Sequence, residues 1–306
     1  MSYWNYQGHV STTPGDDMLH TPPQERGKWK KAPSPGWQSK VRLSANLSWL
    51  FKEVPFLERF EAASTCGFRV VEFGDLDSTC GDAGAVRVAL GTNSLSLALI
   101  NISPGDQPGD RGLAGIPDRE QEWVAQFNRV IRFANDCGCT RIHILAGTVE
   151  KGADEATYVK RLQWGAKFAA ELGLVLLVEP LNPIDFPGYL IPDAETALRV
   201  IEAVDAPNCR LQLDLYHLAK GSQLTTQELV EEVKYLLPHA AHVQVANPPD
   251  RHEPGMGDID FDAVLSMLDD LGYNGFVGLE YRPSASTVES LQWAKPFGVR
   301  TEALGW

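Results

Sequence analysis

Several features that define common protein classes are scarce in this sequence. Only five cysteines occur among 306 residues, at positions Cys66, Cys80, Cys137, Cys139 and Cys209. An odd, scattered set in a chain of this length favours reduced thiols over a disulfide framework and predicts a reducing compartment. The single close pair, Cys137 and Cys139, has no partner cluster beside it, so we do not expect a zinc or redox site there.

The sequence also lacks an excess of positive charge and long apolar runs. Lys and Arg number 27 against 40 Asp and Glu, and the formal net charge of -13 makes nucleic acid an unexpected partner. No run reaches the ~18 apolar residues of a membrane span. The first residues have neither the basic start nor the apolar core of a secretory signal. We therefore expect a cytoplasmic protein without a membrane partner.

The composition nevertheless supports a large folded domain. Hydrophobic residues make up 43% of the chain and charged residues 22%, enough to build a core. Residues 1–39 differ, with many prolines, the basic stretch KWKK and few aliphatic side chains, which predicts an N-terminal extension or arm. Its tryptophans, including Trp29 and Trp37, leave open whether the arm packs on the body or on a partner subunit of a homo-oligomer. The catalytic domain is then residues 40–306.

From residue 40 onward, apolar strand-like runs alternate with helix-period stretches. Because eight strand-then-helix units occur in one chain, the pattern predicts a (β/α)8 TIM barrel. An open doubly wound sheet is the alternative, but no Gly-rich phosphate loop follows the first strand. The predicted strands are 41–48, 69–73, 95–102, 141–147, 174–181, 210–217, 241–247 and 276–281, and the clearest helices follow at 54–65, 119–136, 156–173 and 261–272.

Polar residues recur near the ends of these strands, where the chemistry of such barrels collects. They are Asn46, Glu72, Asn101, His143, Glu179, Asp214 with His217, Gln244 and Glu280. Glu179, Asp214, Gln244 and Glu280 come from four consecutive strands. Two Glu, one Asp and one amide oxygen form a hard oxygen set suited to Mg²⁺ or Mn²⁺. A divalent ion would also explain why Glu179 ends the apolar run LVLLVEPL (174–181).

Simpler interpretations exist for each residue taken alone. A Glu or Asp at a strand end is often a helix cap or a surface ion pair, and Gln244 alone would more often be a satisfied core amide. His143 and His217 are each ambiguous when taken alone. His217, three residues beyond Asp214, would leave its strand just above the metal, where a substrate oxygen could lie. Asp260 is expected to cap the helix that follows it.

Two loops carry arginines that suit a substrate carboxylate. The Gly- and Pro-rich loop 104–120 has the composition of a segment that covers a site and contains Arg111, and the stretch RHEPGMGDIDF begins with Arg251. A planar guanidinium binds a carboxylate through two parallel hydrogen bonds. Either arginine is equally compatible with a solvent-exposed surface charge.

The sequence resembles the hydroxypyruvate isomerase family of the xylose isomerase-like barrel superfamily. The stretches that carry the resemblance are SANLSWLFKEVPFLERFEAASTCGFRVVEF (44–73), PGDQPGDRGLAGIPDRE (104–120), VEPLN (178–182), QLDLYH (212–217), HVQVANPPDRHEPGMGDIDF (242–261) and GFVGLEYRPSAST (275–287). The resemblance implies a (β/α)8 barrel and a divalent ion held by Glu179, Asp214, Gln244 and Glu280. The two glutamates are implied as the proton-transfer pair, with His217 and Arg251 touching substrate. We add Arg111, His143, Asn46 and Glu72 as candidate substrate contacts.

The expected reaction is therefore the interconversion of hydroxypyruvate, a small 2-keto acid, and tartronate semialdehyde through an enediolate. A 2-oxo-tetronate isomerase or a ketose 3-epimerase on the same scaffold is the alternative. Metal-dependent DNA-repair endonucleases form a related branch, but they use histidine-rich ligand sets and basic grooves, whereas this acidic chain has seven histidines. A non-catalytic barrel whose arm mediates assembly is the most distant alternative.

Overall fold

The computed structural model describes residues 40–75 and 82–302. The predicted arm, residues 1–39, lies outside the described residues, as does Cys80, so the domain boundary at residue 40 stays a prediction. The four described cysteines are buried, and none of them forms a disulfide. None of the described helices is both long and apolar enough to cross a membrane.

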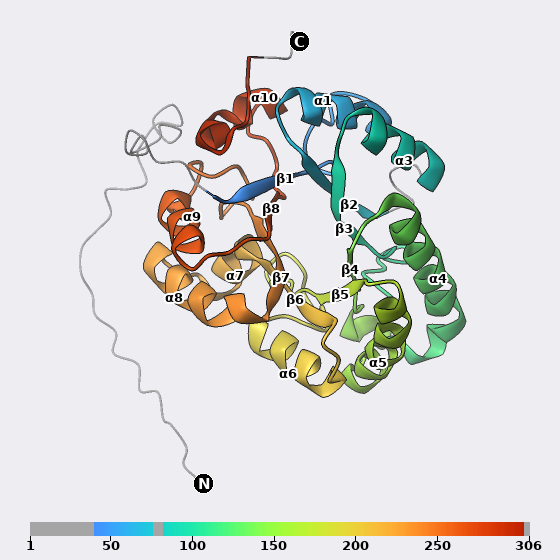
Figure 1. The fold of residues 1–306 in the computed structure, drawn as a ribbon. Coiled ribbons are helices and arrows are strands. Elements are labelled where there is room, and N and C mark those ends of the chain that lie inside the picture. The colour runs from blue at the N-terminus through green and yellow to red at the C-terminus, as the bar shows by residue number, and fades with distance from the viewer. Residues whose placement is uncertain (1–39, 76–81, 303–306) are drawn as a thin grey trace, which may run out of the picture.

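Eight parallel strands form a closed barrel in chain order (Figure 1). The ring closes where β8 pairs with β1, with Leu43 opposite Val277. This confirms the predicted (β/α)8 barrel and excludes the open doubly wound sheet. The strands are β1 Arg42–Asn46, β2 Val70–Asp75, β3 Ser96–Asn101, β4 Arg141–His143, β5 Val175–Val178, β6 Cys209–Asp214, β7 Ala240–Val245 and β8 Phe276–Leu279.

Helices cover the outside of the barrel (Figure 1). The α-helices are α1 Arg59–Thr65, α3 Ala83–Thr92, α4 Glu120–Cys137, α5 Glu155–Glu171, α6 Ala194–Val204, α7 Leu215–Ser222, α8 Thr226–Leu236, α9 Phe261–Asp270 and α10 Thr287–Ser290. Short 3₁₀ helices are η2 Phe56–Glu58, η3 Pro117–Arg119, η4 Val149–Lys151, η5 Leu237–His239 and η6 Gln292–Phe297.

The helix ends follow local chemistry. In α4 the buried positions Trp123, Phe127, Val130 and Ala134 recur at helical spacing and face the barrel, and Gly138 ends the helix with a left-handed φ of 67°. The side chain of Asp260 accepts hydrogen bonds from the first turn of α9, which confirms the predicted cap.

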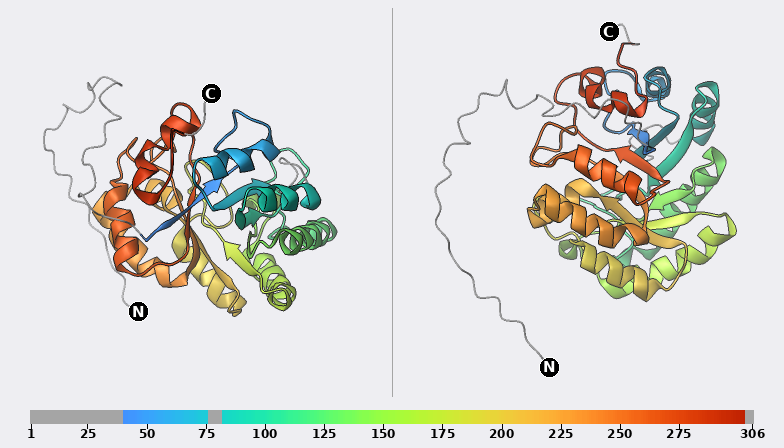
Figure 2. Two further views of the ribbon diagram at one scale, coloured as in Figure 1. Left: turned by 45° about the horizontal axis from the view of Figure 1, so that its top comes forward. Right: turned by 60° about the vertical axis from the view of Figure 1, so that its left-hand side comes forward.

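The segment at the end of the described chain packs against the segment between β1 and β2. The helix α10 lies beside α1 in both Figure 1 and Figure 2, and the amide of Arg300 donates to the carbonyl of Cys66 at 2.8 Å. Gly67, with a φ of 92°, passes so close to Gly298 that an added Cβ would lie 2.9 Å from its carbonyl oxygen. The segment after β8 is thus packed against the segment after β1.

Three predicted strands end earlier than expected. The strands predicted over 141–147 and 174–181 end at His143 and Val178. The strand predicted over 210–217 ends at Asp214, and α7 begins at Leu215. The Asp214 carboxylate accepts a hydrogen bond from the amide of Tyr216 at 2.9 Å, so it caps the helix as well as ending the strand. His217 consequently projects from the first turn of α7.

Candidate active site

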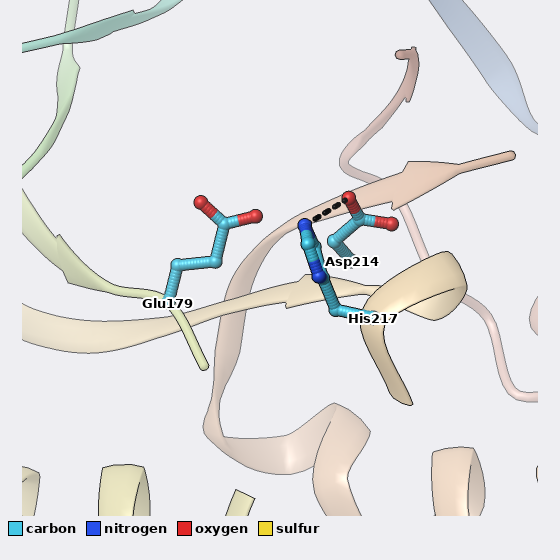
Figure 3. A group of neighbouring side chains, drawn as sticks. All are labelled: Glu179, Asp214 and His217. Atoms are coloured by element: carbon cyan, nitrogen blue, oxygen red, sulfur yellow. Dashed lines mark ion pairs between the residues drawn. The ribbon is translucent and has the colours of Figure 1, made fainter. Parts of the chain in front are cut away.

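Acidic side chains from consecutive strands converge at the carboxyl end of the barrel. Glu179 follows β5 directly, and Asp214 ends β6. Ligand atoms of Glu179, Asp214 and His217 all lie within 4.8 Å of one another, and the three side chains project into one space (Figure 3). Each is at least 96% buried, with relative exposures of 4%, 2% and 4%. The structure thus places two of the four predicted metal ligands together with the predicted substrate histidine.

The tautomer of His217 follows from its surroundings. Its Nδ1 accepts the backbone N–H of Asn182 at 3.1 Å, so in the neutral ring the proton is on Nε2. Nε2 lies 3.7 Å from Oδ2 of Asp214, the contact dashed in Figure 3. Burial, and then the charge of Arg251, lower the pKa of His217 far below its ordinary value. The residue is therefore a neutral donor, which suits it to a substrate oxygen better than to a metal ion.

Arg251 contacts several members of this group. Its Nη2 lies 3.1 Å from Oδ2 of Asp214 and 3.6 Å from Oε1 of Glu280, and its Nη1 lies 3.3 Å from Nε2 of His217. The guanidinium is sandwiched between the rings of Trp49 and Tyr216, with its central carbon 4.8 Å from each centroid. The backbone of Arg251 adopts a φ of 62°, and its carbonyl accepts the amide of Arg282 at 2.7 Å.

The pKa values of the three carboxylates near Arg251 are shifted in the same direction. Burial raises the pKa of Glu179, Asp214 and Glu280 above the ordinary values, and Arg251 opposes the rise in all three. The negative charge of Asp214 raises the pKa of Glu179 further. Full ionisation of all three carboxylates would therefore need positive charge beyond the one guanidinium of Arg251.

A layer of amide side chains lies beneath the carboxylates. The Nε2 of Gln212 donates to Oε1 of Gln244 at 2.6 Å, and Gln212 also forms a hydrogen bond with Glu179. The Nε2 of Gln244 donates to Oε1 of Glu72 at 2.9 Å. Gln212 was missed by our sequence reasoning, although it lies two residues before Asp214 in the alternating run RLQLDL and so faces the same side of β6.

Glu72 and Asn46 lie within this layer. Glu72 is fully buried and its carboxylate meets three side chains: Asn46 at 3.2 Å, Gln244 at 2.9 Å and His242 at 2.9 Å. The amide oxygen of Asn46 accepts the N–H of Ser48 at 3.0 Å. Both predicted substrate contacts therefore have protein partners for their polar groups, and a direct role toward substrate stays a prediction.

His143 lies against Glu179 from the neighbouring strand. Its Nδ1 is 3.0 Å from Oε2 of Glu179, and the ring is 1% exposed. Burial lowers the pKa of His143 to about 3, so the ring is neutral at any physiological pH. Neither ring nitrogen of His143 has a hydrogen-bond partner among the described residues, so the neutral imidazole packs against the Glu179 carboxylate without adding a second charge.

Arg111 lies at the outer edge of the site. It is exposed, and its guanidinium carbon lies 5.2 Å from the centroid of the Phe186 ring, which in turn is 5.5 Å from the ring of His217. The loop that carries it is attached by the Gly112–Ala146 bridge and by Asp110, whose carboxylate pairs with Arg119 at 2.7 Å. Arg111 thus packs on Phe186, which in turn packs on His217.

The donor set suits a hard divalent cation. Within residues 40–75 and 82–302, Arg251 supplies the one Lys or Arg side chain within 4.0 Å of Glu179, Asp214 or Glu280, so its single positive charge is outnumbered when all three carboxylates are ionised. Glu179 and Asp214 offer converging oxygens. Glu280 is linked to Asp214 by Arg251, which lies within 4.0 Å of both carboxylates. The amide oxygen of Gln244 accepts a hydrogen bond from Gln212. No cysteine belongs to this cluster of described residues, which favours oxygen-preferring ions.

Comparison with known proteins identifies relatives of this chain. Residues 60–297 match the family described as "Xylose isomerase-like TIM barrel". The chain is 36% identical to the hydroxypyruvate isomerase of Escherichia coli (strain K12) over 262 residues, which cover 84% of this chain and 99% of that one. It is 38% identical over 261 residues to a 2-oxo-tetronate isomerase of Cupriavidus necator, covering 84% and 98% of the two chains.

A solved structure extends the comparison to three dimensions. The protein titled "AP endonuclease, family 2" from Brucella melitensis superimposes with a TM-score of 0.78 at 37% identity, covering 84% of this chain and 99% of that one. The matches confirm the expected fold and the expected isomerase class. The chain belongs to the hydroxypyruvate isomerase family of xylose isomerase-like TIM barrels.

Proposed function

We propose that this protein is a metal-dependent isomerase that interconverts hydroxypyruvate and tartronate semialdehyde through an enediolate. The observation that carries the proposal is the meeting of buried carboxylates, Glu179 and Asp214 with Glu280 nearby, and two adjacent cationic or neutral donors, Arg251 and His217. Mg²⁺ or Mn²⁺ is the proposed ion. When bound by Glu179, Asp214, Gln244 and Glu280, it would supply charge stabilisation for the enediolate oxygens.

Substrate binding follows from the donors. The Nε2–H of His217 and the Nη1–H of Arg251 lie 3.3 Å apart, and two donors cannot satisfy each other. An anionic oxygen placed between them would accept from both, so this pair is suited to the carboxylate or the 2-oxygen of a short keto acid. Such charge-assisted hydrogen bonds fix the orientation of the three-carbon substrate.

The glutamates move the protons. One of Glu179 and Glu280 removes a proton from C3 of hydroxypyruvate, and the C3–H electron pair forms the C2–C3 double bond of the enediolate. A proton is then delivered to C2, and the proton of the C3 hydroxyl passes to the C2 oxygen, so that C3 becomes the aldehyde carbon, C2 carries the hydroxyl, and no atom or electron is gained overall. Because burial raises the pKa of both glutamates, each is a stronger base than a solvated carboxylate, as proton abstraction beside a carbonyl needs.

The alternative is an isomerase of a longer 2-oxo acid. The similarity to the Cupriavidus necator protein, named 2-oxo-tetronate isomerase, favours it, and the same donors would bind its carboxylate. A ketose 3-epimerase would gain little from Arg251, because its substrate carries no charge. A non-catalytic barrel would have no need for a metal ion, and metal analysis of the purified protein separates that alternative.

The test is proton NMR of hydroxypyruvate in D₂O with the Mg²⁺- or Mn²⁺-loaded protein. We expect deuterium incorporation with formation of tartronate semialdehyde, abolished in Glu179→Gln and in Glu280→Gln. The matched control is Glu171→Gln, the same change at an exposed position at the end of α5. Inert hydroxypyruvate together with exchange of 2-oxo-tetronate or a ketose would overturn the substrate and keep the barrel chemistry.

A further inference from the structure

The loop after β1 supplies a tryptophan that the mechanism above does not use. Trp49 follows Asn46, the last residue of β1, and the turn between them is held by the carbonyl of Asn46, which accepts the amides of Trp49 at 3.1 Å and Leu50 at 2.8 Å. The amide of Phe51 then donates to Oγ1 of Thr287, in the segment after β8, at 2.8 Å. The loop is therefore fixed at both sides of Trp49.

The side chain of Trp49 contacts two groups of the site at once. Its indole Nε1–H donates to Oε1 of Glu280 at 3.0 Å. The face of the same indole covers the guanidinium of Arg251, whose central carbon lies 4.8 Å from the ring centroid. The polar edge of Trp49 thus contacts Glu280, a proposed proton-transfer residue, and its π face contacts Arg251, a proposed substrate-binding residue.

These contacts keep two opposite charges apart. Arg251 and Glu280 approach to 3.6 Å, longer than the ~2.7–2.9 Å of a direct charge-assisted hydrogen bond. A direct ion pair would weaken Glu280 as a base and would turn the guanidinium away from substrate. Because the indole N–H occupies the oxygen of Glu280 that faces Arg251, and the ring holds the guanidinium plane, the pair stays at the longer distance.

We propose that Trp49 is a positioning residue with two separable effects: its N–H aligns Glu280 for proton transfer, and its ring aligns Arg251 for carboxylate binding. This inference rests on the proposed isomerase function, but the contact itself can be tested without it. The two effects predict different kinetic results for different substitutions, because phenylalanine keeps an aromatic face and lacks the N–H, whereas leucine lacks both.

The kinetic test compares these variants with hydroxypyruvate as substrate. We expect Trp49→Phe to lower kcat about 10-fold with KM within twofold of wild type, since one hydrogen bond to a charged group is lost. Trp49→Leu should lower kcat by a similar factor and also raise KM about 5-fold, since the cation–π contact is lost. Trp164→Phe, on the outer surface at 37% exposure, is the control and should change neither constant.

A second measurement separates the contact from the catalysis. The indole ¹H–¹⁵N resonance of Trp49 is identified by its absence in Trp49→Phe, and it should shift in Glu280→Gln. If that resonance does not move, or if Trp49→Phe keeps the wild-type kcat while melting normally, the positioning role is wrong. If the resonance shifts while the wild-type protein isomerises no keto acid, the contact stands and only the proposed function is overturned.

Discussion

A single added methyl group at Gly278 should disrupt the layer beneath the active site. A Cβ at this position in β8 would lie 2.5 Å from Oε2 and 2.6 Å from Cδ of Glu72, and closer still to Oε1. Real Cβ atoms do not come this close, and the neighbour is the fully buried carboxylate that receives hydrogen bonds from Asn46, Gln244 and His242. Gly278→Ala therefore forces Glu72 out of position.

The magnitude follows from two effects. Overpacking of a filled interior costs about 1–3 kcal/mol, and each lost hydrogen bond to a buried carboxylate costs ~1.5–3 kcal/mol, partly recovered by rearrangement. We expect a loss of about 3 kcal/mol in the free energy of unfolding, and a melting temperature lower by roughly 6–12 °C in a domain of this size. Displacement of Glu72 also frees the amide of Gln244, so activity should fall with stability.

The assay is urea or thermal unfolding of Gly278→Ala beside Gly91→Ala. Gly91 lies in α3 with nothing within 4 Å of an added Cβ, and alanine there should stabilise the helix by ~0.5–1 kcal/mol. In a Glu72→Ala background the cost of Gly278→Ala should largely disappear, because the clash has been removed. A Gly278→Ala protein as stable as wild type would refute the placement of Glu72 against β8.

Further predictions concern the charged groups. Arg251→Met should raise KM for hydroxypyruvate about 10–100-fold in steady-state assays, whereas replacement of Arg111, which is exposed and packs on Phe186, by Met should raise it less than about 5-fold. Equal effects would contradict this order. The affinity for Mn²⁺, measured by calorimetry, should fall as pH is lowered from about 8 to 6, because burial raises the pKa of Glu179, Asp214 and Glu280, and protons compete for the same oxygens. An affinity independent of pH would mean that these carboxylates are not ligands.

The sequence predicts the barrel well because strand and helix periods are local properties. All eight strands lie where the apolar runs indicate, and Glu179 and Glu280 directly follow β5 and β8. The boundary after Asp214 was missed because the apolar run LDLYH continues across it, while the capping bond that ends the strand depends on backbone geometry.

The contacts within the site were harder to predict. Trp49 and Glu280 are 231 residues apart in the chain, and no local pattern marks an indole that crosses from one strand end to another. Glu72 lies at the end of a predicted strand like the metal candidates, but its side chain points into the amide layer. Only the register between strands determines whether a carboxylate at a strand end points toward the metal candidates or into the amide layer.

The polar layer inside the barrel has a consequence for redesign. Glu72, Gln212, His242 and Gln244 fill positions that an engineer seeking thermostability would replace with aliphatic side chains. Such a repacked interior would tolerate heat better while losing the template that orients the residues above it. A library aimed at new substrates should therefore keep these four positions and Trp49 constant and vary other residues of the segments 47–55, 104–120 and 182–190, which lie outside the strands.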